Sequence, residues 1–80
     1  FKVVLKFAKS QKGYLTTQPL HSSQQLMSED EKSFTLGIKV YITYELVERI
    51  LSYGEDVFVI QPAKLKELVK KRLLKAVKQY

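Results

Sequence analysis

Apolar and polar residues alternate in two stretches of this chain, and a period of two predicts a β-strand with one buried face. The first stretch is residues 1–7 and the second is residues 34–41. The apolar positions are Phe1, Val3, Leu5 and Phe7 in the first stretch and Phe34, Leu36, Ile38 and Val40 in the second. A third strand is predicted at residues 57–60, a dense β-branched and aromatic run typical of buried strands.

Residues 20–28 are polar but extended in character, and a charged turn at residues 28–33 connects them to the second alternating stretch. Two such segments around a polar turn predict a hairpin. Because residues 20–28 are the poorer strand formers, we place them at an edge of the sheet. Residues 8–15 predict a short, weak helix, which the sequence Gln18-Pro19 ends because proline disfavours helical geometry in the residue before it.

Two longer helices are predicted in the second half of the chain. One begins at Thr43, a candidate N-cap, and ends near Gly54, a natural C-cap. The other opens at Pro62 and carries lysines opposite an apolar stripe. The stripe consists of Leu65, Leu68, Val69, Leu73, Ala76, Val77 and Tyr80. This stripe has to be buried against the same domain or against a partner.

The predicted order is β, α, β, β, α, β, followed by an additional helix. One sheet with two helices on one face satisfies this order, so the predicted fold class is α+β, a ferredoxin-like split βαβ (βαββαβ) arrangement with an additional C-terminal helix. We expect residues 1–80 to form a single domain. Because the chain starts at Phe1 rather than at methionine, we also expect it to be a piece of a longer protein.

Composition argues against catalysis. The chain has no cysteine, which excludes disulfides and thiolate metal sites and fits a cytoplasmic origin. Its one histidine, His21, has no partner at the spacing of a zinc site or of a nucleophile and base. The three glycines stand alone, so there is no phosphate-binding loop. We therefore expect no enzyme, cofactor or metal, and no membrane segment, since no apolar run approaches about 20 residues.

The net charge of +6 is concentrated at one end of the chain. Residues 1–63 carry seven basic and seven acidic residues, whereas residues 64–80 carry seven basic residues and only Glu67. The final helix therefore presents either a solvated polar face or a surface for an acidic partner such as nucleic acid.

The segment His21-Ser22-Ser23-Gln24-Gln25 is polar where the edge strand is predicted. In a strand, His21, Ser23 and Gln25 share one face, and Ser22 and Gln24 share the other. A solvated edge strand, which resists aggregation, is one interpretation. A recognition edge is the other, because histidine and glutamine side chains both donate and accept hydrogen bonds.

Five short motifs follow one another in an order that resembles a known family. They are Val3-Val4-Leu5-Lys6-Phe7, Leu20-His21-Ser22-Ser23-Gln24, Ile50-Leu51-Ser52-Tyr53-Gly54, Val57-Phe58-Val59-Ile60-Gln61-Pro62 and Leu65-Lys66. Together they resemble the C-terminal extension (WCX) domain of WYL-domain transcription regulators, over nearly the whole chain. Family members often have Trp and Pro at positions 20 and 22, and Phe at position 53, where this chain has Leu, Ser and Tyr.

The resemblance implies a longer protein with an N-terminal winged helix-turn-helix domain, a middle WYL domain and this module. It implies a ferredoxin-like fold, in agreement with the order derived from periodicity. It also implies roles in dimerisation and in sensing effectors, which include nucleic acids or nucleotide-like ligands. DNA would be bound by the N-terminal domain, outside this chain.

The favoured hypothesis is a non-catalytic regulatory, oligomerisation and effector-sensing module of a bacterial DNA-binding regulator, present as a homodimer. An effector held between this domain and a neighbour would shift the population of DNA-competent dimers. The candidate ligand-binding residues are His21, Ser23 and Gln24, with Lys71, Arg72 and Lys75 supplying positive charge. The alternative is a free-standing ferredoxin-like nucleic-acid-binding domain that uses the basic C-terminal helix. A small acyl-phosphate hydrolase would need an asparagine, and the chain has none.

Overall fold

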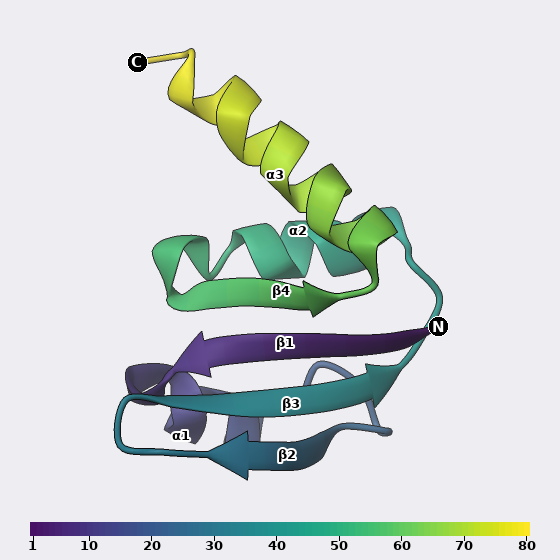
Figure 1. The fold of residues 1–80 in the computed structure, drawn as a ribbon, viewed down its shortest axis with the longest axis vertical. Helices are drawn as coiled ribbons and strands as arrows, with labels where there is room; N and C mark the ends of the chain where they lie inside the picture. The colour runs from purple at the N-terminus through teal and green to yellow at the C-terminus, as the bar shows by residue number, and fades with distance from the viewer.

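Four antiparallel strands form the sheet in the order β2-β3-β1-β4, in a computed structural model that describes residues 1–80 (Figure 1). The strands are β1 Lys2–Ala8, β2 Gln25–Glu29, β3 Ser33–Lys39 and β4 Val57–Gln61. β1 lies in the centre, paired with β3 on one side and with β4 on the other. The two alternating stretches of the sequence are therefore the two central strands, and their pairing brings the apolar positions onto one face.

Three helices complete the structure, α1 Lys12–Thr17, α2 Tyr44–Leu51 and α3 Ala63–Val77, with 3₁₀ turns at Lys9–Gln11 and Gly54–Asp56. In Figure 1, α1 and α2 lie behind the sheet, on one of its faces. The element order confirms the predicted βαββαβ arrangement with an additional C-terminal helix. Thr43 caps α2 as predicted, because its hydroxyl accepts a hydrogen bond of 3.1 Å from the backbone N–H of Leu46.

The core lies between the helices and the face of the sheet that carries alternate residues of β1 and β3. In the β1–β3 register, Val3 pairs with Ile38, Leu5 with Leu36 and Phe7 with Phe34, and all of these side chains are buried. The rings of Phe7 and Phe34 stack with centroids 5.6 Å apart. The helices contribute Leu15, Val47, Ile50, Leu65 and Val69. Burial of these apolar side chains is the main stabilising term of the fold.

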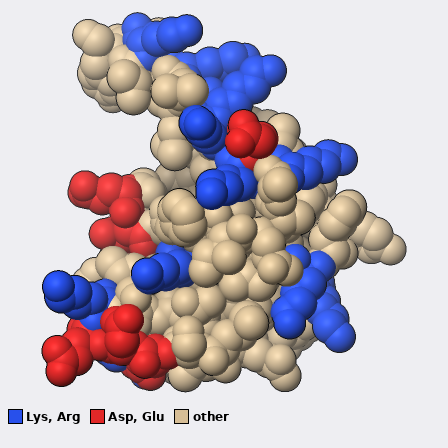
Figure 2. Space-filling model, viewed as in Figure 1, with Lys and Arg blue, Asp and Glu red and all other residues tan.

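No helix covers the opposite face of the sheet, which we call the open face. It carries Lys2 and Lys6 of β1. Their register partners in β3, Lys39 and Thr35, lie on the same face. Figure 2 views this face: basic side chains gather on α3 and again at the lower right, and acidic ones lie on the left, at the turn between β2 and β3 and in a second group above it. The charge asymmetry of the sequence is therefore an asymmetry in space.

The edge strand is shorter than predicted. β2 begins at Gln25, and residues 20–24 form a compact turn instead of the first half of a strand. The expected alternation of His21, Ser23 and Gln25 on one face is therefore wrong. The physical reason is local, because the Gln24 and His21 side chains accept hydrogen bonds from the backbone N–H groups of Leu20 and Ser23, and such bonds favour a turn over a strand.

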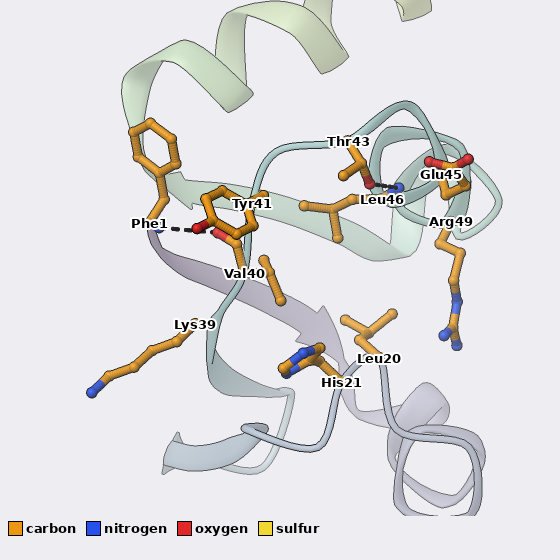
Figure 3. A pocket seen from close by; sticks show the side chains of 10 residues that line it. All are labelled: Phe1, Leu20, His21, Lys39, Val40, Tyr41, Thr43, Glu45, Leu46 and Arg49. Atoms are coloured by element: carbon orange, nitrogen blue, oxygen red, sulfur yellow. Dashed lines mark hydrogen bonds between the residues drawn. The ribbon is translucent and has the colours of Figure 1, made fainter.

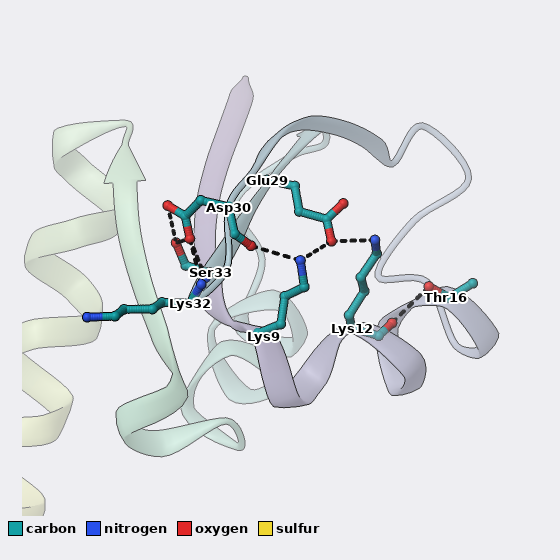
Figure 4. Close-up of polar contacts among 7 residues, drawn as sticks. All are labelled: Lys9, Lys12, Thr16, Glu29, Asp30, Lys32 and Ser33. Atoms are coloured by element: carbon teal, nitrogen blue, oxygen red, sulfur yellow. Dashed lines mark hydrogen bonds and ion pairs between the residues drawn. The ribbon is translucent and has the colours of Figure 1, made fainter.

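Two carboxylates stabilise the charged turn between β2 and β3 through hydrogen bonds and ion pairs (Figure 4). Asp30 accepts hydrogen bonds of 2.8 Å from the backbone N–H groups two and three residues later, which lower the pKa of its carboxyl. Glu29 pairs with Lys12 and Lys9, whose hydrogen bonds lower the pKa of that carboxyl too. The acidic cluster therefore ties the hairpin to the segment that follows β1.

α3 begins after Pro62 as predicted, but only its first half is buried. Leu65 and Val69 belong to the core, where α3 packs on β4 and α2. Further along the predicted stripe, Leu73 and Val77 are exposed, and Figure 1 shows the end of the helix projecting beyond the sheet. The stripe is thus partly buried against this domain, and its C-terminal half stays open to solvent.

Candidate functional site

A pocket of about 580 Å³ opens where three segments meet: the turn before β2, the end of β3 and the first half of α2 (Figure 3). Leu20, Val40 and Leu46 provide apolar side chains that pack against the core. The turn before β2 lies far in sequence from the other two segments, which follow one another along the chain. The pairing of β2 with β3 and the packing of α2 on the sheet bring them together.

Polar and aromatic groups surround these apolar side chains. His21 and Lys39 lie on one side of the pocket and Glu45 and Arg49 on the other, and the Tyr41 side chain is 83% exposed at its mouth. The Lys39 side chain extends away from the other lining residues (Figure 3), so the pocket combines apolar contact, a ring available for stacking, hydrogen-bond donors and the cationic Arg49 beside one carboxylate. Such a combination is typical of small-ligand sites.

His21 is held in one orientation by its own turn. The backbone N–H of Ser23 donates to Nδ1 at 3.1 Å, and the Ser23 hydroxyl lies 2.8 Å from the same atom. Because a backbone N–H can only donate, Nδ1 acts as an acceptor, so the neutral ring carries its proton on Nε2. Nε2–H forms no hydrogen bond within the protein and is free to donate to a ligand.

Ser23 and Gln24 hold the turn together. The Ser23 hydroxyl accepts from the backbone N–H of Lys39 at 2.8 Å and lies 3.3 Å from the carbonyl oxygen of the same residue. The Gln24 side chain accepts from the N–H of Leu20 at 2.9 Å and donates to the carbonyl of Leu15 at 3.1 Å. Of the three predicted residues in this segment, only His21 lines the pocket.

Arg49 connects α2 to the start of the same turn. Its guanidinium reaches the carbonyl oxygens of Pro19 at 3.4 Å and Gln18 at 3.5 Å. No carboxylate lies within ion-pair distance of it. The positive charge of Arg49 therefore remains available at the edge of the pocket.

The three predicted residues on α3 lie apart from this pocket, on the helix that packs beside β4 at the other edge of the sheet. Arg72 donates to Glu48 at 2.7 Å and its guanidinium lies 5.6 Å from the ring centre of Tyr44. The pair lowers the pKa of the Glu48 carboxyl and raises the pKa of Arg72. Arg72 thus fastens α3 to α2, whereas Lys71 and Lys75 are exposed without an ion-pair partner.

Apart from His21, the residues that line the pocket were not predicted as ligand-binding from the sequence, among them the polar and charged residues Lys39, Tyr41, Glu45 and Arg49. None belongs to a motif of chemical significance, and only the folded arrangement brings them beside His21. The structure contains no group of three or more His, Cys, Asp or Glu side chains able to hold a metal ion. None of its helices has the length and apolar character needed to cross a bilayer.

The strand order and the placement of α1 and α2 define the chain as a ferredoxin-like α+β protein with an added C-terminal helix. The sequence pattern of the WCX domain matches residues 1–77, and the chain belongs to the WCX domain family. WCX domains are regulatory modules of WYL-type, DNA-binding transcription regulators. A search of curated proteins gives no match.

Proposed function

We propose that residues 1–80 are a single domain that acts as the C-terminal, non-catalytic module of a bacterial DNA-binding transcription regulator, where it senses an effector and supports dimerisation. Membership of the WCX domain family supports the regulatory part of this proposal. The observation that carries the sensing part is the pocket beside His21, whose ring is fixed with one donor left free. In this proposal the protein is cytoplasmic, and DNA is bound by an N-terminal domain outside the chain.

The pocket suits a ligand with a flat ring and an acidic group, as in a nucleotide or the end of a single-stranded nucleic acid. The exposed ring of Tyr41 offers a surface for stacking. The Nε2–H group of His21 can donate to an oxygen, and Arg49 supplies positive charge. Ser23 and Gln24 contribute by holding His21 in place.

The mechanism proposed is a shift of population rather than a chemical reaction. A ligand in the pocket contacts the turn before β2, the end of β3 and α2 at once, and its outer side faces solvent or a neighbouring domain. If it binds the DNA-competent arrangement of domains more tightly, it increases the share of that arrangement. The size of the effect is limited by the difference between the two affinities.

Fluorescence anisotropy with a labelled single-stranded hexathymidylate tests the sensing proposal. We expect saturable binding by the wild-type chain and affinity about three- to tenfold weaker in His21→Ala, because one hydrogen bond to the ligand is lost. Ser22→Ala is the matched control, since Ser22 is exposed in the same turn and makes no hydrogen bond. Absence of saturable binding, or equal weakening in both variants, contradicts the proposal. Sedimentation velocity of the same samples tests dimerisation separately.

A second candidate function, nucleic-acid binding through α3, is favoured by the placement of its lysines. Lys64, Lys71, Lys75 and Lys78 lie within about 60° of one another around the helix axis. None of them has an ion-pair partner. Duplex DNA binding that falls steeply with salt, and that is lost in Lys71→Glu/Lys75→Glu, would support this function. Arg72 is left unchanged in that variant because it fastens α3 to α2.

A further inference from the structure

Lys2 and Lys39 face each other across β1 and β3 on the open face, although both carry a positive charge. The neighbouring pair, Phe1 and Val40, exchanges two backbone hydrogen bonds of 3.0 Å. Hydrogen-bonded and non-hydrogen-bonded pairs alternate along an antiparallel ladder, so Lys2 and Lys39 form a close, non-hydrogen-bonded pair with Cα atoms about 4.5 Å apart. Like charges directly opposite one another destabilise a sheet.

No carboxylate of the protein compensates this lysine pair. The ion pairs of the structure join Lys9 and Lys12 to Glu29, and Arg72 to Glu48. The acidic turn between β2 and β3 lies at the opposite end of β1, where Ala8 rather than Lys2 pairs with the start of β3. Positive charge at this end of the open face is therefore unmatched.

The surface between the two lysines and β2 is hollowed into a pocket of about 360 Å³, to which Gln25 also contributes. Gln25 is the register partner of Gly37, which places it on the open face. The thioether of Met27 lies over Gly37 and forms the apolar floor of the hollow, with its Sδ 2.8 Å from the position that a Cβ on Gly37 would take. Cε of Lys2 lies 3.8 Å from the same position. The Lys2 side chain therefore reaches across β3 at Gly37, beside Met27, and lines the hollow.

We propose that this hollow binds a phosphate group, either free or as a phosphate ester, through the ammonium groups of Lys2 and Lys39 and the side-chain amide of Gln25. Ammonium groups and amides are the donors that phosphate oxygens accept from. A phosphate between the two lysines replaces their mutual repulsion with two attractions. The same ligand chemistry is met by inorganic phosphate, a nucleotide or the backbone of a nucleic acid.

The phosphate site lies outside the pocket beside His21 but shares Lys39 with it. The two lie on either side of the turn formed by residues 20–24, and Lys39 lines both. Ser23 connects them, because its hydroxyl binds the backbone of Lys39 and lies against the ring of His21. A phosphate bound to Lys39 therefore lies next to the element that orients His21.

Titration of the chain with inorganic phosphate at constant ionic strength, followed by ¹H–¹⁵N NMR, tests the site directly. We expect saturable shifts centred on Lys2, Gln25 and Lys39. The variant Lys2→Gln/Lys39→Gln should bind at least about tenfold more weakly, because two charged hydrogen bonds are lost. The charge-matched control Lys71→Gln/Lys75→Gln removes the same charge from α3 and should leave binding unchanged.

Thermal unfolding provides a second readout. Without phosphate, Lys39→Gln should melt at or above the wild-type temperature, because the repulsion from Lys2 is gone. Phosphate should raise the melting temperature of the wild type and of the α3 control but not of Lys39→Gln, since only a folded state with the site is stabilised by the ligand. Shifts that never saturate, or equal weakening in both double variants, would show a general effect of charge and overturn the proposal.

Discussion

Ser23 supplies with its side chain the hydrogen bonds that a longer β2 would supply with its backbone. Its hydroxyl contacts both the N–H and the carbonyl of Lys39, the last residue of β3. The same hydroxyl lies 2.8 Å from Nδ1 of His21. One side chain therefore closes the end of the sheet and fixes the orientation of the histidine that faces the pocket.

Replacing Ser23 with alanine should destabilise the domain by about 1 to 2 kcal/mol, because the N–H of Lys39 and Nδ1 of His21 both lose a partner. Urea unfolding followed by circular dichroism measures the change. Ser22→Ala serves as the control, since Ser22 makes no hydrogen bond in the same turn, and its effect should stay within about 0.5 kcal/mol. Equal losses of unfolding free energy in the two variants would show that the hydrogen bonds of the Ser23 hydroxyl do not stabilise the domain.

Tyr53 makes a different case, because its hydroxyl is buried without a hydrogen-bond partner. Its ring packs edge-on against Phe7 with centroids 5.1 Å apart, and burial raises the pKa of the phenol. Tyr53→Phe keeps the ring and removes the unsatisfied group, so we expect a gain in stability of up to about 1 kcal/mol. A lower urea midpoint for Tyr53→Phe than for the wild type would contradict this interpretation.

The sequence predicts His21, Ser23 and Gln24 together as ligand-binding residues, but it does not distinguish which of them faces a ligand and which bonds to the backbone. All three are polar, and a motif alone does not tell whether a polar side chain reaches a ligand or the protein's own backbone. The structure assigns Ser23 and Gln24 to backbone contacts and leaves His21 facing the pocket. Ligand contact by His21 remains a prediction, and so does that of Lys71, Arg72 and Lys75.

Among the elements, α3 is divided between two environments. Val69 is 6% exposed and packs with the core, whereas Val77, two turns later on the same stripe, is 68% exposed. The periodicity of the sequence is the same at both positions, and it could not indicate where the sheet beneath the helix ends. The burial of the helix depends on the length of β4 and the position of α2.

The same substitution at these two positions separates burial from helix propensity. Val69→Ala should cost about 1 to 3 kcal/mol, because two methyl groups leave a packed site. Val77→Ala should be neutral or slightly stabilising, within about 0.5 kcal/mol, since alanine is the better helix former. Urea unfolding measures both. A large loss in Val77→Ala would mean that the projecting end of α3 is buried in solution, and sedimentation velocity would then identify a second copy as the cover.

The elements that the sequence predicted best are those with strict alternation. β1 and β3 follow the period of two because one face of each is buried against the helices. The sequence predicts a strand at residues 20–28 because they are extended in character and a charged turn connects them to the second alternating stretch. Local bonds from the side chains of Gln24 and His21 to backbone N–H groups within the same segment favour a turn, and such bonds leave no periodic signal.

At the scale of the whole molecule, element order was sufficient to predict the fold, because a βαββαβ chain with two helices on one face has few ways to pair its strands. The pockets could not be predicted in the same way. His21 and Arg49 belong to segments that meet only after β2 pairs with β3 and α2 packs on the sheet. The lysine pair on the open face likewise follows from the register of β1 and β3, which a sequence pattern does not fix.

Three carboxyl groups, in the turn between β2 and β3 and on α2, make the stability of the whole domain depend on pH. The carboxyls of Glu29, Asp30 and Glu48 all have lowered pKa values in the folded protein, because lysines, backbone N–H groups and Arg72 respectively stabilise their ionised forms. In the unfolded chain these carboxyls return to ordinary values near 4. The stability they contribute is therefore fully present above about pH 5 and is lost as the pH falls through the lower, folded-state values.

We expect the urea midpoint of the wild type to be constant near neutral pH and to fall steadily below about pH 4. The variant Asp30→Asn keeps an oxygen acceptor for the turn but removes the charge, so it should be less stable than the wild type at neutral pH. Because the wild-type carboxyl becomes protonated in acid, the two midpoints should converge as the pH falls. Glu31→Gln, which removes a carboxylate without a hydrogen bond or ion pair, is the control and should keep a constant difference from the wild type. A difference between Asp30→Asn and the wild type that does not change with pH would show that acid acts through net charge alone rather than through the turn.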